Sequence, residues 1–128
     1  MQMNTAKTHK DLLIWQKSMD LSVLVYKITN TFPKEELYGI TSQMRRASVS
    51  IPSNIAEGYG RFSDKEFVRF LFISLGSASE LETQIDLSLR LGFISEDNHN
   101  TLNKLVQETL KMLIALIKYK NKIINQDS

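Results

Sequence analysis

Residues 45–61, RRASVSIPSNIAEGYGR, are the most informative segment of this chain. The sequence around them has helical periodicity, yet Pro52 stands where a helix interior is expected, and serines replace bulky residues at positions 48, 50 and 53. A proline inside a helix removes one hydrogen bond and clashes with the preceding turn. Residue choices that oppose the surrounding fold often mark a strained or functional site.

The apolar residues on both sides of this stretch recur at helical spacing and predict four long helices. The expected helices cover about 11–32, 36–60, 64–91 and 96–124. Pro33 ends the first helix, the Ser63-Asp64-Lys65-Glu66 capping box begins the third, and Gly92 ends it. Because the connections are short, we expect an all-α fold, an antiparallel up-down four-helix bundle.

Each predicted helix has one apolar stripe that should face the core. The four stripes are Ile14, Leu21, Val25, Ile28 and Phe32; Ile40, Met44, Ala47, Ile51 and Ile55; Phe67, Leu71, Ala78 and Ile85; and Leu102, Val106, Leu113 and Ile117. Further apolar residues lie outside these stripes, namely Trp15, Met19, Val23 and Tyr26 on the first helix and Phe72, Ile73 and Leu87 on the third. They indicate either a wide core face or the interface of a homo-oligomer, formed by Trp15, Met19, Val23, Tyr26 and Phe72.

Length and composition place the chain among single-domain proteins. We expect one bundle domain over 11–124, with flexible ends at 1–10 and 125–128. There is no cysteine, so disulfides and thiolate chemistry are excluded. No apolar run reaches the roughly 18 residues of a membrane span, and the N-terminus lacks an apolar signal segment. We therefore expect a cytoplasmic protein.

Two basic surfaces are candidates for binding nucleic acid. The first consists of Arg45, Arg46, Arg61, Lys65 and Arg69. Guanidinium groups pair well with phosphate oxygens. The alternative is that Arg45, Arg46 or Arg61 pairs within the chain, with Glu57, Glu80 or a helix C-terminus.

The second surface is a lysine rail on the last predicted helix, composed of Lys104, Lys111, Lys118 and Lys122. These positions lie within about 40° on a helical wheel, opposite the core stripe. Lys120 adds charge near the tip of the helix, and residues 101–128 carry five basic and two acidic residues. Such a rail fits a phosphate backbone without reading its sequence, although a solvated helix face has the same pattern.

Asn54, Glu57 and Glu80 form the one candidate for a buried polar network. We expect them to satisfy backbone groups freed by Pro52 and to fix the pairing of the second and third helices. A di-metal site needs Glu-x-x-His pairs on two helices, and the chain has only His9 and His99, so we expect no metal and no cofactor. No serine has a histidine placed as its base, so we expect no enzyme activity. We also expect Gly76 to allow close helix approach; a tolerated surface glycine is the alternative.

Several motifs occur in one order: Leu13-Ile14-Trp15-Gln16-Lys17, Phe32-Pro33, the segment 38–47, Ser50-Ile51-Pro52-Ser53-Asn54-Ile55-Ala56-Glu57-Gly58, and the segment 76–82. Over about 11–122 the chain resembles the bacterial four-helix bundle family encoded by intervening sequences in 23S ribosomal RNA genes, also called the S23 ribosomal protein family. The resemblance implies a homopentameric ring. A related branch includes the accessory variability protein of diversity-generating retroelements, which assists a reverse transcriptase and binds nucleic acid through basic surface.

Together these observations favour a non-enzymatic, homo-oligomeric protein that binds RNA or an RNA–protein complex through basic surface. Its expected partners are its own copies and either structured RNA or a reverse-transcriptase-type protein, with no membrane. The alternative is an interaction scaffold whose ring docks a protein partner without contacting nucleic acid.

Overall fold

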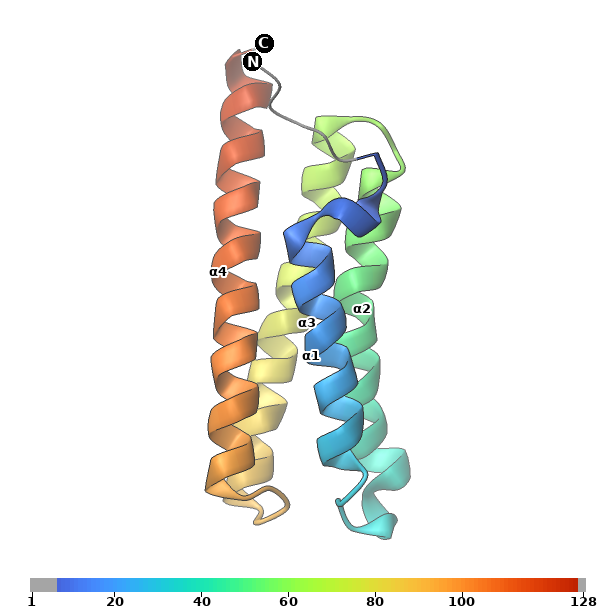
Figure 1. Cartoon of the computed structure of the whole chain (residues 1–128), viewed down its shortest axis with the longest axis vertical. Coiled ribbons are helices and arrows are strands. Elements are labelled where there is room, and N and C mark those ends of the chain that lie inside the picture. The colour runs from blue at the N-terminus through green and yellow to red at the C-terminus, as the bar shows by residue number, and fades with distance from the viewer. Residues whose placement is uncertain (1–6, 127–128) are drawn as a thin grey trace.

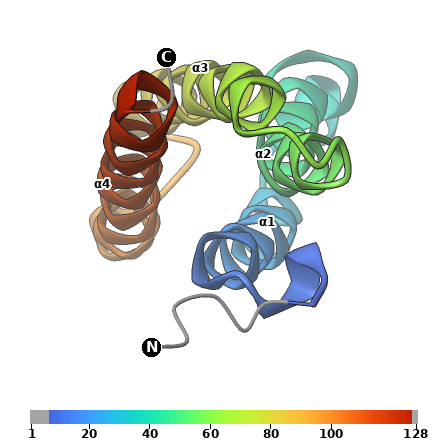
Figure 2. The ribbon, with the colours of Figure 1, turned by 90° about the horizontal axis from the view of Figure 1, so that it is seen from above.

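The computed structural model describes residues 7–126, and over that range the chain forms helices and turns without strands. Its four α-helices are α1 (Leu13–Thr29), α2 (Ser42–Tyr59), α3 (Asp64–Arg90) and α4 (Glu96–Gln126). They run alternately down and up, and each stands beside the helix that follows it in the chain (Figures 1 and 2). The fold is the antiparallel four-helix bundle that the sequence predicts.

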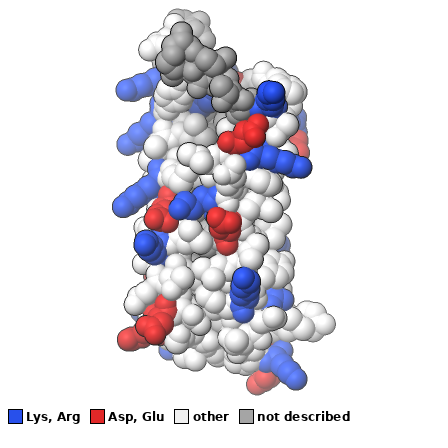
Figure 3. Space-filling view, viewed as in Figure 1, with Lys and Arg blue, Asp and Glu red and all other residues white. Residues whose placement is uncertain are grey.

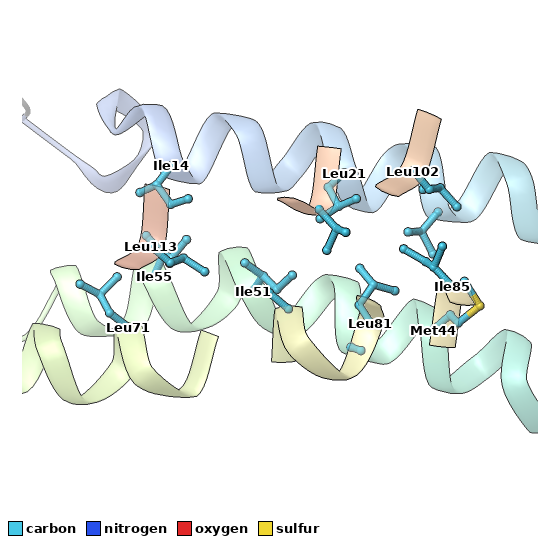
Figure 4. Packing of buried hydrophobic residues seen from close by; sticks show 14 of the residues in the cluster. Ile14, Leu21, Met44, Ile51, Ile55, Leu71, Leu81, Ile85, Leu102 and Leu113 are labelled. Carbon is cyan, nitrogen blue, oxygen red and sulfur yellow. The ribbon is translucent and has the colours of Figure 1, made fainter. Parts of the chain in front are cut away.

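The core consists of the four predicted stripes, and every residue of these stripes is buried. Side chains from different helices, such as Ile14, Ile55 and Leu113, point into the space between the helices (Figure 4). Burying one large aliphatic side chain stabilises the fold by about 1.5–3 kcal/mol, so this core dominates the stability of the bundle. Within the described residues, no helix is both long enough and apolar enough to cross a membrane.

The first helix is shorter than predicted at both ends. At its start, Thr8 and Asp11 form a capping box around a separate 3-10 turn over His9–Asp11. At its end, the chain leaves α1 at Thr29 and continues through tight turns to Phe32, whose amide donates to the Thr29 carbonyl. Pro33 disfavours helical backbone in Phe32, the residue before it, so the helix cannot continue past this point.

The expected flexible ends lie partly outside the described residues, at 1–6 and 127–128. Within the described residues, the backbone amides of Lys7 and Thr8 donate to the Asp11 carboxylate at 2.9 and 3.3 Å. At the other end, α4 extends to Gln126, two residues beyond the predicted end at Ile124.

The second helix begins later than predicted. A 3-10 turn over Lys34–Glu36 and a wider turn over Leu37–Thr41 precede α2. Gly39 has non-helical backbone angles, with φ −109° and ψ −120°, and so separates this turn from the helix. From Ser42 onwards α2 is continuous through Pro52, which is buried.

The two remaining connections follow the predicted signals. Ser63 caps α3 by accepting a hydrogen bond from the Glu66 amide at 3.4 Å. Gly92 ends the α3 region with φ +77°, a backbone conformation that glycine adopts without strain.

The glycine that brings α2 and α3 together is Gly58, and the prediction for Gly76 is wrong. A Cβ on residue 58 would lie 2.6 Å from the Cβ of Phe70, whereas a Cβ on residue 76 would have no neighbour within 4 Å. Gly76 is exposed, so the alternative of a tolerated surface glycine holds. Gly58 lies three residues after Ile55 and therefore falls on the core stripe of α2.

Candidate nucleic-acid interface

The lysine rail lies on the outer face of α4. Lys104, Lys111, Lys118 and Lys122 are all exposed, and none of them makes an ion pair within residues 7–126. Figure 3 shows Lys and Arg side chains projecting one above another along the edge of the molecule that α4 forms in Figure 1. The buried stripe of α4 faces the opposite way, so the helix holds these four ammonium groups in one line.

Lys120 belongs to a different surface from the rail. Its Nζ lies 3.1 Å from Oδ1 of Asp64 and 5.9 Å from the centre of the Phe67 ring. On a helix, residue 120 is turned about 160–200° from residues 118 and 122. Its charge is therefore directed toward the start of α3 and does not extend the rail.

Arg45 is tied to the C-terminal end of α1. Its Nε donates to Thr29 Oγ1 at 3.0 Å, a second nitrogen donates to Asn30 Oδ1 at 3.3 Å, and the guanidinium lies 4.7 Å from the centre of the Tyr26 ring. Arg45 therefore pairs within the chain, at the C-terminal end of a helix, and so links α1 to α2.

Arg61 and Arg69 are also paired, but at the surface. Arg61 binds Glu57 at 2.8 Å and Arg69 binds Glu66 at 3.0 Å. Both guanidinium groups lie near the Phe70 ring, at 5.1 and 4.5 Å from its centre. Exposed pairs of this kind contribute little to stability, so a phosphate can compete for either arginine.

The Glu66–Arg69 pair changes the acidity of both partners. The hydrogen bond from Arg69 lowers the pKa of Glu66, and the positive charges of Arg69 and Arg61 act in the same direction. The same hydrogen bond raises the pKa of Arg69. Both groups therefore stay charged across the neutral range.

Arg46 and Lys65 are the members of the first basic surface that make neither an ion pair nor a side-chain hydrogen bond within the described residues, whereas Arg45 has its hydrogen bonds to Thr29 and Asn30. Both are exposed. Arg46 lines a hollow of about 200 Å³ between α2 and α3, together with Gln43, Ala47, Ser50, Ser77 and Glu80. Arg46 and Glu80 line the same hollow but do not form a salt bridge. Of the five residues of the first basic surface, Arg45, Arg61 and Arg69 therefore have side-chain partners within the chain, and Arg46 and Lys65 are the two available to a ligand.

The predicted buried polar network of Asn54, Glu57 and Glu80 does not exist. Glu57 and Glu80 are exposed, and they bond to Arg61 and Gln84 respectively. Asn54 Nδ2 donates to the carbonyl and the hydroxyl of Ser50, at 2.8 and 3.0 Å. The carbonyl that Pro52 leaves without its usual donor is that of residue 48, so Asn54 does not replace the missing bond.

Serine hydroxyls provide the polar links between helices that the sequence analysis missed. Ser22 of α1 bonds to Ser48 of α2 at 3.1 Å in a buried position. Across the α2–α3 boundary, Ser74 Oγ donates to the Ile51 carbonyl at 2.9 Å. Ser74 stands at a core-stripe position of α3, and a small hydroxyl there is the signal that could have revealed it.

A second α2–α3 link lies at the Arg46 hollow, where Ser77 Oγ donates to Ser50 Oγ at 2.9 Å. This bond also occupies the hydroxyl to which Asn54 donates. Ser48 and Ser50 of the opening motif are therefore contact points between helices.

The extra apolar residues of α1 and α3 remain at the surface of the chain. Met19, Val23, Tyr26 and Phe72 are 38–52% exposed. Trp15, Met19 and Val23 also line an apolar groove of about 370 Å³ between α1 and α2, opposite Val49 and Pro52. A wide core face is thus excluded for these four exposed residues, and the oligomer interface stays a prediction.

The two histidines lie in separate parts of the structure, and each contacts a different residue. His99 Nε2 lies 2.9 Å from Asp86 Oδ1, and the His9 ring packs edge-on against Trp15 with centres 5.2 Å apart. Within the described residues, no three His, Asp or Glu side chains gather as metal ligands would.

The sequence and the fold of this chain match those of a known protein family. A family model described as 23S rRNA-intervening sequence protein matches residues 10–115. Among solved structures, the chain is similar to a protein of unknown function from the S23 ribosomal protein family of Bacteroides thetaiotaomicron. The two chains are 28% identical with a TM-score of 0.75, and the match covers 83% of this chain and 99% of the other. No curated protein matches the sequence.

Proposed function

The chain belongs to the family of 23S rRNA-intervening sequence proteins, and we propose that it is a non-enzymatic, homo-oligomeric cytoplasmic protein that binds structured RNA through basic surface. The observation that carries this proposal is the lysine rail of α4. Its four ammonium groups are exposed and make no ion pair with residues 7–126, in contrast to Arg45, Arg61 and Arg69, which have partners within the chain.

A rail of this kind binds through the phosphate backbone. Each phosphate that a lysine neutralises releases condensed counterions, so the logarithm of affinity falls linearly with the logarithm of salt concentration. The rail offers no fork of donors for a base edge, because ammonium groups act as point charges. We therefore expect binding with little dependence on nucleotide sequence and a strong dependence on ionic strength.

The test is binding of a structured RNA hairpin, and separately of single-stranded DNA, at two salt concentrations. Combining Lys111→Glu with Lys118→Glu should weaken RNA binding and reduce the magnitude of the salt slope by about two. The matched control combines Lys27→Glu with Lys34→Glu, two exposed lysines at the other end of the bundle. That variant has the same net charge and should retain the wild-type slope.

Two results would contradict the proposal. Undetectable RNA binding by the wild-type protein at low salt would refute RNA binding as such. An equal loss of RNA affinity in the two double variants would show that net charge alone matters, and would refute the rail as the RNA-binding surface.

Arg46 provides a second, independent contact in this proposal. Arg46→Ala should reduce the salt slope by about one without lowering stability, because the side chain is exposed and has no ion pair in the described part of the chain. Its neighbour is the matched control, since Arg45→Ala removes contacts to Thr29, Asn30 and Tyr26. Arg45→Ala should lower the free energy of unfolding and leave the salt slope unchanged.

In a homo-oligomer, every copy of the chain would contribute its own lysine rail. The family resemblance supports a homopentamer, in which each copy would add one rail to a common surface. Contacts linked in this way act at high effective concentration, so a weak patch becomes a strong multivalent surface. The exposed residues Met19, Val23 and Tyr26 support an interface on α1.

A second candidate function is a scaffold that docks a protein partner, such as a reverse-transcriptase-type protein. The apolar groove between α1 and α2 favours it, because apolar concave surfaces suit protein partners better than phosphates. A partner that co-purifies after nuclease treatment, and is lost in Met19→Glu but not in the rail variant, would support the scaffold over RNA binding.

A further inference from the structure

Phe62, in the connection between α2 and α3, departs from expectation in two independent ways. Its side chain is 91% exposed, although phenylalanine is among the residues most often buried. Its backbone has φ +55°, in the left-handed region where a bulky non-glycine residue is an outlier. Glycine would make the same turn without strain, so folding alone does not account for an aromatic residue here.

Phe62 forms one wall of a small slot at the end of the bundle. The Phe62 slot has a volume of about 220 Å³, and its lining residues are Tyr59, Phe62, Ser63, Asp64, Phe67 and Lys120. The rings of Tyr59 and Phe67 meet edge to face inside it, with centres 5.8 Å apart. Asp64 and Lys120 form their 3.1 Å ion pair at the same place and provide an acceptor and a donor.

This combination fits a flat aromatic ring with polar edges. Aromatic walls favour stacking with a planar ligand, and a carboxylate beside an ammonium group can pair with amino and carbonyl groups on the edge of that ligand. The chain on both sides is basic at positions 61 and 65, and Lys65 is exposed without an ion pair in the described residues. The slot therefore combines a stacking surface with nearby cations, as surfaces that bind unpaired nucleotides do.

We propose that the Phe62 slot takes an unpaired nucleobase of the bound RNA, which stacks on the Phe62 ring while Lys65 contacts the adjoining phosphate. The inference rests on the proposed function and deepens it, since the rail of α4 recognises a phosphate backbone of any form. The slot adds a preference for RNA that has a bulged or single-stranded nucleotide.

The test compares two RNA hairpins that differ in one nucleotide. One hairpin is fully paired, and the other has a single bulged 2-aminopurine, whose fluorescence falls when it stacks on an aromatic ring. Wild-type protein should bind the bulged hairpin roughly tenfold more tightly than the paired one and quench its fluorescence, as expected for one stacked base.

The variants separate stacking from folding. Phe62→Ala should abolish both the preference and the quenching, and Phe62→Trp should retain them. Phe62→Gly should also lose the preference, yet it should raise the midpoint of urea unfolding because glycine removes the left-handed strain. The matched control is Tyr38→Ala, which removes a 92% exposed aromatic residue from the Leu37–Thr41 turn before α2 and should change neither measurement.

Three results would overturn the inference. Equal, salt-dependent affinity of the wild-type protein for both hairpins would refute the slot and leave the rail intact. Absence of binding to either hairpin at low salt would refute the slot together with the proposed function. A lower oligomer mass in Phe62→Ala, with unchanged preference for the bulge, would assign Phe62 to an interface between copies of the chain.

Discussion

Gly58 of α2 packs directly against Phe70 of α3, so that a Cβ on residue 58 would lie 2.6 Å from the Phe70 Cβ. That separation is too short for two carbon atoms, and both are on helix backbones that cannot move independently. The contact also fixes the Phe70 ring, which carries the Arg61 and Arg69 guanidinium groups on its faces. Gly58 thus permits the close α2–α3 approach at Phe70.

Gly58→Ala should therefore destabilise the protein, although alanine is the better helix former. Inserting a methyl group into a packed contact costs about 1–3 kcal/mol, which exceeds the gain of about 1 kcal/mol in helix propensity. Urea denaturation followed by circular dichroism measures the change. An unfolding midpoint at or above that of the wild-type protein would show that α2 and α3 are not in this close contact.

Gly76→Ala should have the opposite effect. Gly76 lies inside α3, is exposed, and offers open space where a Cβ would stand. Replacing a mid-helix glycine with alanine in such a position should raise the free energy of unfolding by up to about 1 kcal/mol. The same denaturation experiment applies, and a loss of stability would mean that Gly76 faces a neighbour such as a second copy of the chain.

Ser48→Ala should cost more than its small change in volume suggests. Ser48 is fully buried, and its hydroxyl is the hydrogen-bond partner of Ser22 across the α1–α2 boundary. The variant leaves the Ser22 hydroxyl buried without that partner, at a cost of about 1–3 kcal/mol. The double variant with Ser22→Ala should recover part of the loss. Additive losses in the two single variants would argue against a direct bond between these serines.

The sequence was sufficient for the fold because its signals were redundant. Helical periodicity and the Ser63 cap agree on the start of α3, and helical periodicity and Gly92 agree on its end. All stripe residues from Ile14 to Ile117 are buried as predicted. The helix boundaries predicted wrongly are those for which the sequence contains only one signal. Pro33 marked the end of the first helix, but the sequence did not reveal that α1 already ends at Thr29 and is followed by turns.

The site was less predictable because side-chain partners depend on packing between helices. The rail could be predicted, since one helix places Lys104 and Lys122 on the same face without reference to its neighbours. Arg45 and Arg46 are adjacent and chemically identical, yet only the packing of α1 beside α2 brings Thr29 within reach of Arg45. Phe62 could not be identified because its left-handed backbone comes from the geometry of the α2–α3 connection.

Acid titration should reveal the Glu66–Arg69 pair. The hydrogen bond from Arg69 holds the pKa of Glu66 below its ordinary value of 4.5. The carboxylate is favoured in the folded state, so its contribution to stability is present at neutral pH and disappears as the pH falls through the lowered pKa. Arg69→Gln should raise the pKa of Glu66 toward 4.5, as measured by NMR on the carboxyl carbon. An unchanged pKa would mean that Arg69 does not hold Glu66 in solution.

The exposed apolar face of α1 should hold copies of the chain together. Met19 and Val23 are 38% and 52% exposed and line the apolar groove between α1 and α2. A charge placed there would have to be desolvated in an interface, which is costly without a partner of opposite charge. Val23→Glu should therefore reduce the mass found by light scattering toward that of one chain, 14.7 kDa.

Leu13→Glu is the matched control for this interface, because Leu13 is 71% exposed on the same helix and lies outside the groove. It introduces the same charge and should leave the mass unchanged. A wild-type protein with the mass of one chain at micromolar concentration would refute the interface. An oligomer that survives Val23→Glu but dissociates in Phe72→Glu would place the interface on α3, and the groove between α1 and α2 would then be open to another protein.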